Sequence, residues 1–107
     1  MRKTIYNKLI RDRIPEIISA NHQTAVISEI PENEFLSYLK TKLREEVDEF
    51  LESEDVEELA DIIEVVLAIL KQKNCSFYEL EKIRTEKVFK NGSFDKRLLL
   101  EEVFSEK

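Results

Sequence analysis

The chain of 107 residues has few of the residue types that interrupt helices or build common catalytic sites. It contains one glycine, two prolines, one cysteine, one histidine and no tryptophan. Scarce glycine and proline favour long helices over a β-rich fold, which needs turn residues at short intervals. A single cysteine, Cys75, excludes an intrachain disulfide and a cysteine-based zinc site. A single histidine, His22, excludes histidine-rich metal sites, so any metal would be a hard cation bound by carboxylate oxygens.

The chain also lacks basic character, since its formal net charge is −6. This balance argues against nucleic acid as a partner, because a nucleic-acid backbone needs a basic surface. No apolar run is long enough to span a bilayer and no signal peptide is recognisable, so we expect no membrane partner and a cytoplasmic location. The length fits one domain, residues 1–107, with a modest core.

The spacing of apolar residues predicts a mainly α fold built on a four-helix bundle. In the second helix, Leu36, Leu39 and Leu43 recur at three- and four-residue steps. The third helix is apolar around most of its circumference, so we expect it at the centre of the domain. The expected helices run from about Asp12 to Asn21, Asn33 to Glu52, Asp55 to Lys73 and Phe77 to Phe89. The expected N-terminal caps are Asp12, Asp55 and the pair Ser76–Glu79, and Asn91-Gly92 is expected to end the last helix in a left-handed conformation.

A small β element is also predicted. Thr24–Ile30 is rich in β-branched residues and reads as a short strand that ends at Pro31. An isolated strand would leave its backbone groups unpaired, so we expect it to pair with residues 94–104. A last helical turn is the alternative for that C-terminal segment.

The most unusual stretch is acidic: 11 of the 22 residues from Arg44 to Val65 are Asp or Glu. Glu46 and Glu49 lie at the edge of the apolar stripe of the second helix, since each residue advances about 100° around a helix. Glu58 and Asp61 stand on a side of the third helix that becomes apolar after one turn. Helices joined by so short a break are expected to be antiparallel neighbours, which would bring the two pairs together near the turn.

Two interpretations of these four carboxylates remain open. Clustered carboxylates raise one another's pKa unless a cation lies among them, and Mg²⁺, or Mn²⁺ in its place, would suit an oxygen site that meets phosphates. Mg²⁺-assisted attack of water on a phosphoanhydride would then need cations for the phosphates. The alternative is a solvated acidic surface, with Glu58 serving only in a capping box with Asp55. The available cations are Lys8, Arg11 and Arg13 in the first segment and Arg84, Lys87 and Lys90 on the fourth helix, and the first three could equally be surface charge.

The motif E-E-x-x-E (Glu45–Glu49) followed by E-x-x-D (Glu58–Asp61) resembles the signature of the all-α nucleotide pyrophosphohydrolases, which include MazG-like enzymes and phosphoribosyl-ATP pyrophosphohydrolase. Two further segments, YNKLIRDRIPEII (Tyr6–Ile18) and EKVFKNGSFDKRLLLEEV (Glu86–Val103), resemble a small-protein branch labelled phosphoribosyl-ATP pyrophosphohydrolase-like. The resemblance therefore extends over nearly the whole chain.

This resemblance implies Mg²⁺-dependent hydrolysis of a nucleoside triphosphate, or a related nucleotide, to the monophosphate and pyrophosphate, as in house-cleaning of the nucleotide pool. It implies that Glu46, Glu49, Glu58 and Asp61 are the catalytic metal ligands, that Glu45 supports them, and that the chain forms a homodimer or homotetramer. Eight residues separate Glu49 from Glu58, fewer than in most MazG-like enzymes, which leaves the nucleotide open. The competing hypothesis is a non-catalytic helical module that binds a nucleotide or a protein.

Overall fold

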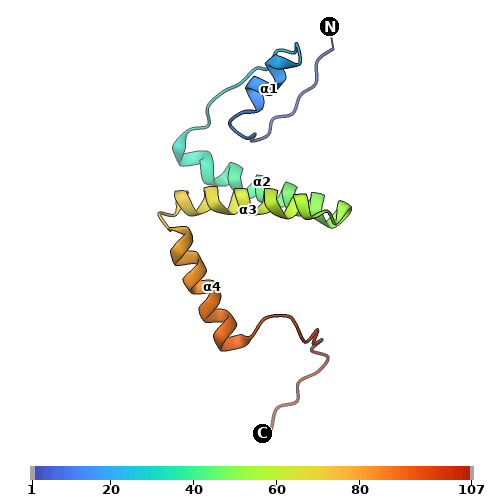
Figure 1. Cartoon of the computed structure of the whole chain (residues 1–107), viewed down its shortest axis with the longest axis vertical. Coiled ribbons are helices and arrows are strands. Elements are labelled where there is room, and N and C mark those ends of the chain that lie inside the picture. The colour runs from blue at the N-terminus through green and yellow to red at the C-terminus, as the bar shows by residue number, and fades with distance from the viewer. Residues whose placement is uncertain (1, 107) are drawn as a thin grey trace. The chain divides into compact units, whose positions relative to one another are not determined.

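The computed structural model describes residues 2–106, and within them the chain forms four α-helices and no strand (Figure 1). The predicted mainly α class is confirmed. The chain divides into two units, one ending at Cys75 and one beginning at Ser76. The helices are α1 (Ile14–Ala20), α2 (Glu32–Ser53), α3 (Val56–Gln72) and α4 (Phe77–Asn91).

The first unit is organised around an antiparallel hairpin of α2 and α3, which lie side by side (Figure 1). The hairpin is tight because Glu54 adopts a left-handed conformation with φ of 60°, and its N–H donates to the Phe50 carbonyl at 2.7 Å. Leu39 of α2 and Val65 of α3 are 2% and 8% exposed. They are the only apolar side chains buried in the described part of the chain, so the hairpin has a small core.

Helix α1 begins one residue later than predicted, and the prediction that Asp12 caps it is wrong. The N-cap position belongs to Arg13, whose side chain makes no capping hydrogen bond. A backbone turn takes the place of a side-chain cap, because the Ile14 N–H donates to the Arg11 carbonyl at 3.1 Å. Pro15 fits the first turn, where its missing N–H would have no helical partner.

The predicted pairing of residues 24–30 with 94–104 is also wrong, since neither segment forms a strand or a helix. Val26 and Ile27 are 100% and 51% exposed, so the β-branched side chains gain no burial from an extended conformation. The two segments belong to different units of the chain. A β-branched sequence alone does not stabilise a strand, because ladder hydrogen bonds and a packed face are both needed.

In the second unit, the predicted Ser76 cap is confirmed, and α4 stops at Asn91-Gly92 as predicted but without the left-handed helical conformation that was expected there. The Ser76 hydroxyl accepts a hydrogen bond from the Glu79 N–H at 3.1 Å, which caps the N-terminus. Gly92 ends the helix with φ of 85° and ψ of 179°, a backbone region that is open essentially to glycine alone. Within residues 2–106, no helix combines the length and the apolar character needed to cross a membrane.

Candidate metal centre

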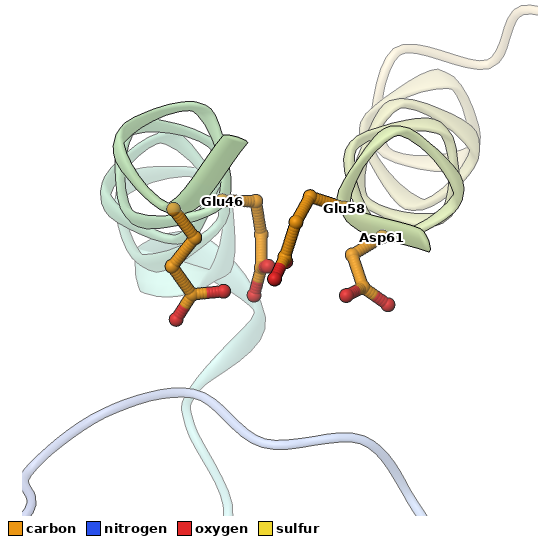
Figure 2. A group of neighbouring side chains, drawn as sticks. Glu46, Glu58 and Asp61 are labelled. Atoms are coloured by element: carbon orange, nitrogen blue, oxygen red, sulfur yellow. The ribbon is translucent and has the colours of Figure 1, made fainter. Parts of the chain in front are cut away.

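The structure brings together Glu46 and Glu49 of α2 with Glu58 and Asp61 of α3. Each offers a carboxylate oxygen, and these atoms all lie within 4.8 Å of one another. Figure 2 shows Glu46 and Glu58 extending toward each other from the facing helices, with Asp61 on the same side. Residues three apart share one face of a helix, so each helix contributes its pair at one level of the hairpin.

The tight connection between the helices determines which role Glu58 can play. Its N–H donates to the backbone carbonyl of Asp55 at 3.1 Å, and the Asp55 side chain makes no capping hydrogen bond. The Asp55 N–H is instead bonded to the Ser53 hydroxyl at 3.1 Å. The capping box that offered an alternative explanation for Glu58 is therefore not formed, and the Glu58 carboxylate joins the cluster.

Glu46 is the buried member of the cluster, with a side chain that is 9% exposed. One of its oxygens, Oε1, lies 3.3 Å from the Lys42 ammonium. The other, Oε2, is buried without a hydrogen-bond partner among the described residues. Burial raises the pKa of the Glu46 carboxyl, and the neighbouring Glu49 carboxyl raises it further, while Lys42 opposes both effects. Glu46 is thus an acid whose ionised form lacks enough compensation from the protein.

Two cations touch the cluster. The Arg11 guanidinium lies 2.6 Å from Asp61 Oδ1, although the two residues are 50 positions apart in the chain. Lys42 lies 3.3 Å from Glu45 and 3.3 Å from Glu46, so it links Glu45 to the cluster. Among residues 2–106, no cationic side chain forms an ion pair with Glu49 or Glu58. Two of the four carboxylates therefore have no cationic partner among these residues, and of the two Glu49 is exposed to water while Glu58 is half-buried.

Lys42 was not among the predicted site residues, although its spacing could have identified it. Lysine at position i can reach acids at i+3 and i+4 on one helical face, and Glu45 and Glu46 occupy those positions. Its side chain is only 16% exposed, so Lys42 is held at the edge of the cluster.

The predicted phosphate-binding residues fall into both units. Lys8 lines a groove together with Lys42, in the same N-terminal segment that brings Arg11 to the cluster. Arg84 and Lys87 belong to α4, in the second unit. There the Arg84 guanidinium makes two hydrogen bonds to Glu81, at 2.8 and 2.9 Å. This contact lowers the pKa of the Glu81 carboxyl and raises that of Arg84.

The cluster is a set of oxygen ligands without nitrogen or sulfur, which is the set preferred by Mg²⁺, Mn²⁺ and Ca²⁺. Comparisons with models of known protein families, with curated proteins and with solved structures give no match.

Proposed function

We propose that the chain is a Mg²⁺-dependent pyrophosphohydrolase that splits a nucleoside triphosphate, or a related nucleotide, into the monophosphate and pyrophosphate. The observation that carries the proposal is the buried Glu46 Oε2, which lacks a hydrogen-bond partner among residues 2–106 and lies in a cluster of four carboxylates. A buried polar group without a partner costs stability, so its presence needs an explanation. A cation held by the cluster supplies one.

The donor set fits a divalent ion of this class. Glu46, Glu49, Glu58 and Asp61 can each present one oxygen within a small volume. Magnesium sites commonly use a few carboxylates and leave positions for water and substrate phosphate. The unpaired charge on Glu49 and Glu58 is also of the right size for a divalent cation. When bound, the ion would lower the pKa of a water molecule and offset charge that develops on the phosphate oxygens.

The chain's own residues would bind and orient the substrate. Arg11 and Lys8 lie on the segment next to the carboxylates and would hold phosphate oxygens, Arg11 through two parallel N–H groups. The Arg11 and Asp61 side chains are 55% and 38% exposed, so their ion pair is worth roughly 0–1 kcal/mol. Arg11 can therefore leave Asp61 for a phosphate at little cost. In the net reaction, water adds to the α phosphorus of the triphosphate. The bond between that phosphorus and the oxygen that bridges it to the β phosphorus breaks, and pyrophosphate departs with this oxygen.

The test is release of pyrophosphate from a panel of canonical and modified nucleoside triphosphates, with Mg²⁺ or Mn²⁺. Glu46→Gln and Asp61→Asn remove ligand charge with little change in size, and each should lower the rate by more than about 100-fold. The matched control is Glu52→Gln, an exposed acid near the end of α2, which should stay within about twofold of the parent.

The competing outcomes are distinct. A clean preparation that releases no pyrophosphate from any nucleotide would refute the proposal, as would full activity in both ligand variants. Nucleotide binding without turnover and without dependence on Mg²⁺ would instead identify a non-catalytic binding module.

We also propose that the helices complete a four-helix bundle with those of another copy, in a homodimer or homotetramer. Support comes from α3, where Val56, Leu59 and Ile63 lie on one face and are 78%, 40% and 55% exposed. Helices with an apolar face normally bury it. Sedimentation should show a dimer or tetramer for the parent, and Ile63→Lys should shift the protein toward the monomer while Glu64→Gln does not. A monomeric parent at micromolar concentration would overturn this part of the proposal.

A further inference from the structure

A groove of about 330 Å³ runs along the first half of α2, beside the carboxylate cluster. Its floor is a column of residues at three- and four-residue steps on one face of the helix, and its wall is the N-terminal segment around Lys8. The floor residues are Glu34, Ser37, Tyr38, Thr41, Lys42 and Glu45. The volume is at the lower end of small-ligand sites, so the groove suits a small molecule.

One end of the groove opens at the cluster. Lys42 and Glu45 line the groove, and the Lys42 ammonium lies 3.3 Å from both Glu45 and Glu46. The other end lies at Glu34, eleven residues before Glu45, which is about 16 Å along the helix axis, and Tyr38 lies between them, about 10 Å from Glu45. A ligand with its phosphates at the cluster would therefore extend its remaining part over Tyr38.

The chemistry of the lining matches that remaining part. The Tyr38 side chain lines the groove and is 42% exposed, so part of this aromatic residue is accessible to a ligand. The Ser37 and Thr41 hydroxyls lie on the same face, with Thr41 bonded to the Ser37 carbonyl at 3.3 Å. Lys8, with its ammonium 5.6 Å from the Tyr6 ring centroid, adds positive charge to the wall. Aromatic rings stack on nucleobases, and hydroxyls bond sugar oxygens.

We infer that this groove is the nucleoside subsite of the enzyme, with the base stacked on Tyr38 and the sugar beside Ser37 and Thr41. The inference rests on the proposed function, because it places the phosphates at the carboxylate cluster. It names Tyr38 as a residue that determines affinity for the nucleoside, and it restricts the substrate class to phosphates that carry a base. Stacking tolerates different bases, so the groove selects for a nucleoside more than for one base.

The experiment measures binding and turnover side by side. Calorimetry with Mg²⁺ and non-hydrolysable α,β-methylene nucleoside triphosphates gives Kd, and pyrophosphate release from the natural nucleotides gives KM and kcat. Tyr38→Ala should raise Kd and KM by about 5- to 150-fold with little change in kcat. Tyr38→Phe keeps the ring and should stay within about twofold. Thr41→Leu places a larger, apolar side chain in the groove at an exposed position, and it should also raise the Kd for the nucleotide.

The control is Tyr78→Ala, which removes a 78% exposed tyrosine from α4 and should leave Kd and KM unchanged. Inorganic tripolyphosphate, which has no base, should bind Tyr38→Ala as well as it binds the parent. Unchanged nucleotide Kd in Tyr38→Ala and Thr41→Leu, with an active parent, overturns the inference and leaves the hydrolase proposal standing. Nucleotide binding that depends on Tyr38 without any turnover supports the subsite and refutes the hydrolase. A parent that binds no nucleotide overturns both.

Discussion

Replacing Glu46 with glutamine should stabilise the metal-free protein and remove its response to Mg²⁺. Glu46 is buried, and its Oε2 has no hydrogen-bond partner in the part of the chain that the structure describes. Burial raises the pKa of its carboxyl, and the Glu49 carboxyl raises it further. A glutamine carbonyl can still accept from Lys42. Its NH₂ group takes the place of Oε2 and can donate to a neighbouring carboxylate. A buried acceptor without a partner is thereby replaced by a donor that has one.

The expected gain follows from the cost of a buried polar group without a partner, about 1–3 kcal/mol. For a small domain, each kcal/mol shifts Tm by about 4–8 °C. In the parent, Mg²⁺ at 100 times its dissociation constant should add about 2.7 kcal/mol. The two effects favour different proteins. In EDTA the variant should melt at a higher temperature than the parent, and in excess Mg²⁺ the parent should gain stability that the variant does not gain.

Thermal unfolding of both proteins in EDTA and across a Mg²⁺ titration measures both effects. Glu52→Gln is the control for removing one negative charge, and it should stay within about 0.5 kcal/mol of the parent and keep the full Mg²⁺ response. A structural role for Glu46 predicts that the glutamine variant is less stable in EDTA. Either that result or an undiminished Mg²⁺ response in the variant would refute the reasoning.

Four further outcomes are expected. In EDTA, the stability advantage of Glu46→Gln over the parent should shrink as pH falls from 7 toward 4.5. The raised pKa of Glu46 lets the folded parent bind a proton at a higher pH than the unfolded chain does, so lower pH stabilises the parent. Urea unfolding at several pH values measures this change in the free energy of unfolding. Leu39→Ala should cost about 2–5 kcal/mol, because Leu39 is 2% exposed, whereas Leu51→Ala, at 68% exposure, should cost under about 0.5 kcal/mol in the same assay. Glu54→Gly should stabilise the hairpin by about 1 kcal/mol, because glycine adopts the left-handed conformation without steric strain, and a lower Tm would contradict this. Arg11→Lys should raise KM more than it lowers kcat, because lysine loses the two-pronged contact with phosphate, and an unchanged KM would argue against a phosphate role.

Features that depend on neighbours within a few positions could be predicted from the sequence. The spacing of Leu36, Leu39 and Leu43 predicted α2, and Leu39 is indeed buried. The Ser76 cap depends on a partner three residues away and is present. The gathering of Glu46 and Glu58 follows from two helical periodicities and a short turn, all of which are local. Such features are determined by backbone geometry alone.

Features that depend on distant partners could not be predicted. The contact between Arg11 and Asp61 joins residues 50 positions apart through a segment without regular structure, and no periodicity indicates it. The strand predicted at Thr24–Ile30 failed for the same reason, since its stability depended on a distant partner strand, and residues 94–104 form no strand. The Asp12 cap is absent because the Ile14 N–H donates to the backbone carbonyl of Arg11 and not to the Asp12 side chain.

The charge pattern within the helices gives an argument that is independent of the resemblance. Elsewhere the chain pairs acids with cations three residues away, as in Arg13 with Glu16 at 3.4 Å and Glu81 with Arg84 at 2.8 Å. In the cluster the same spacing pairs an acid with an acid on both helices, and the two helices then face each other. Like charges at this spacing cost a few tenths of a kcal/mol, and burial of one of them raises the cost. Acids repeat at this spacing on neighbouring faces as well, as in Glu45 with Asp48, so spacing alone does not identify the site. The cluster differs because two such pairs face each other and one member, Glu46, is buried, which is the pattern expected where a ligand supplies the missing charge.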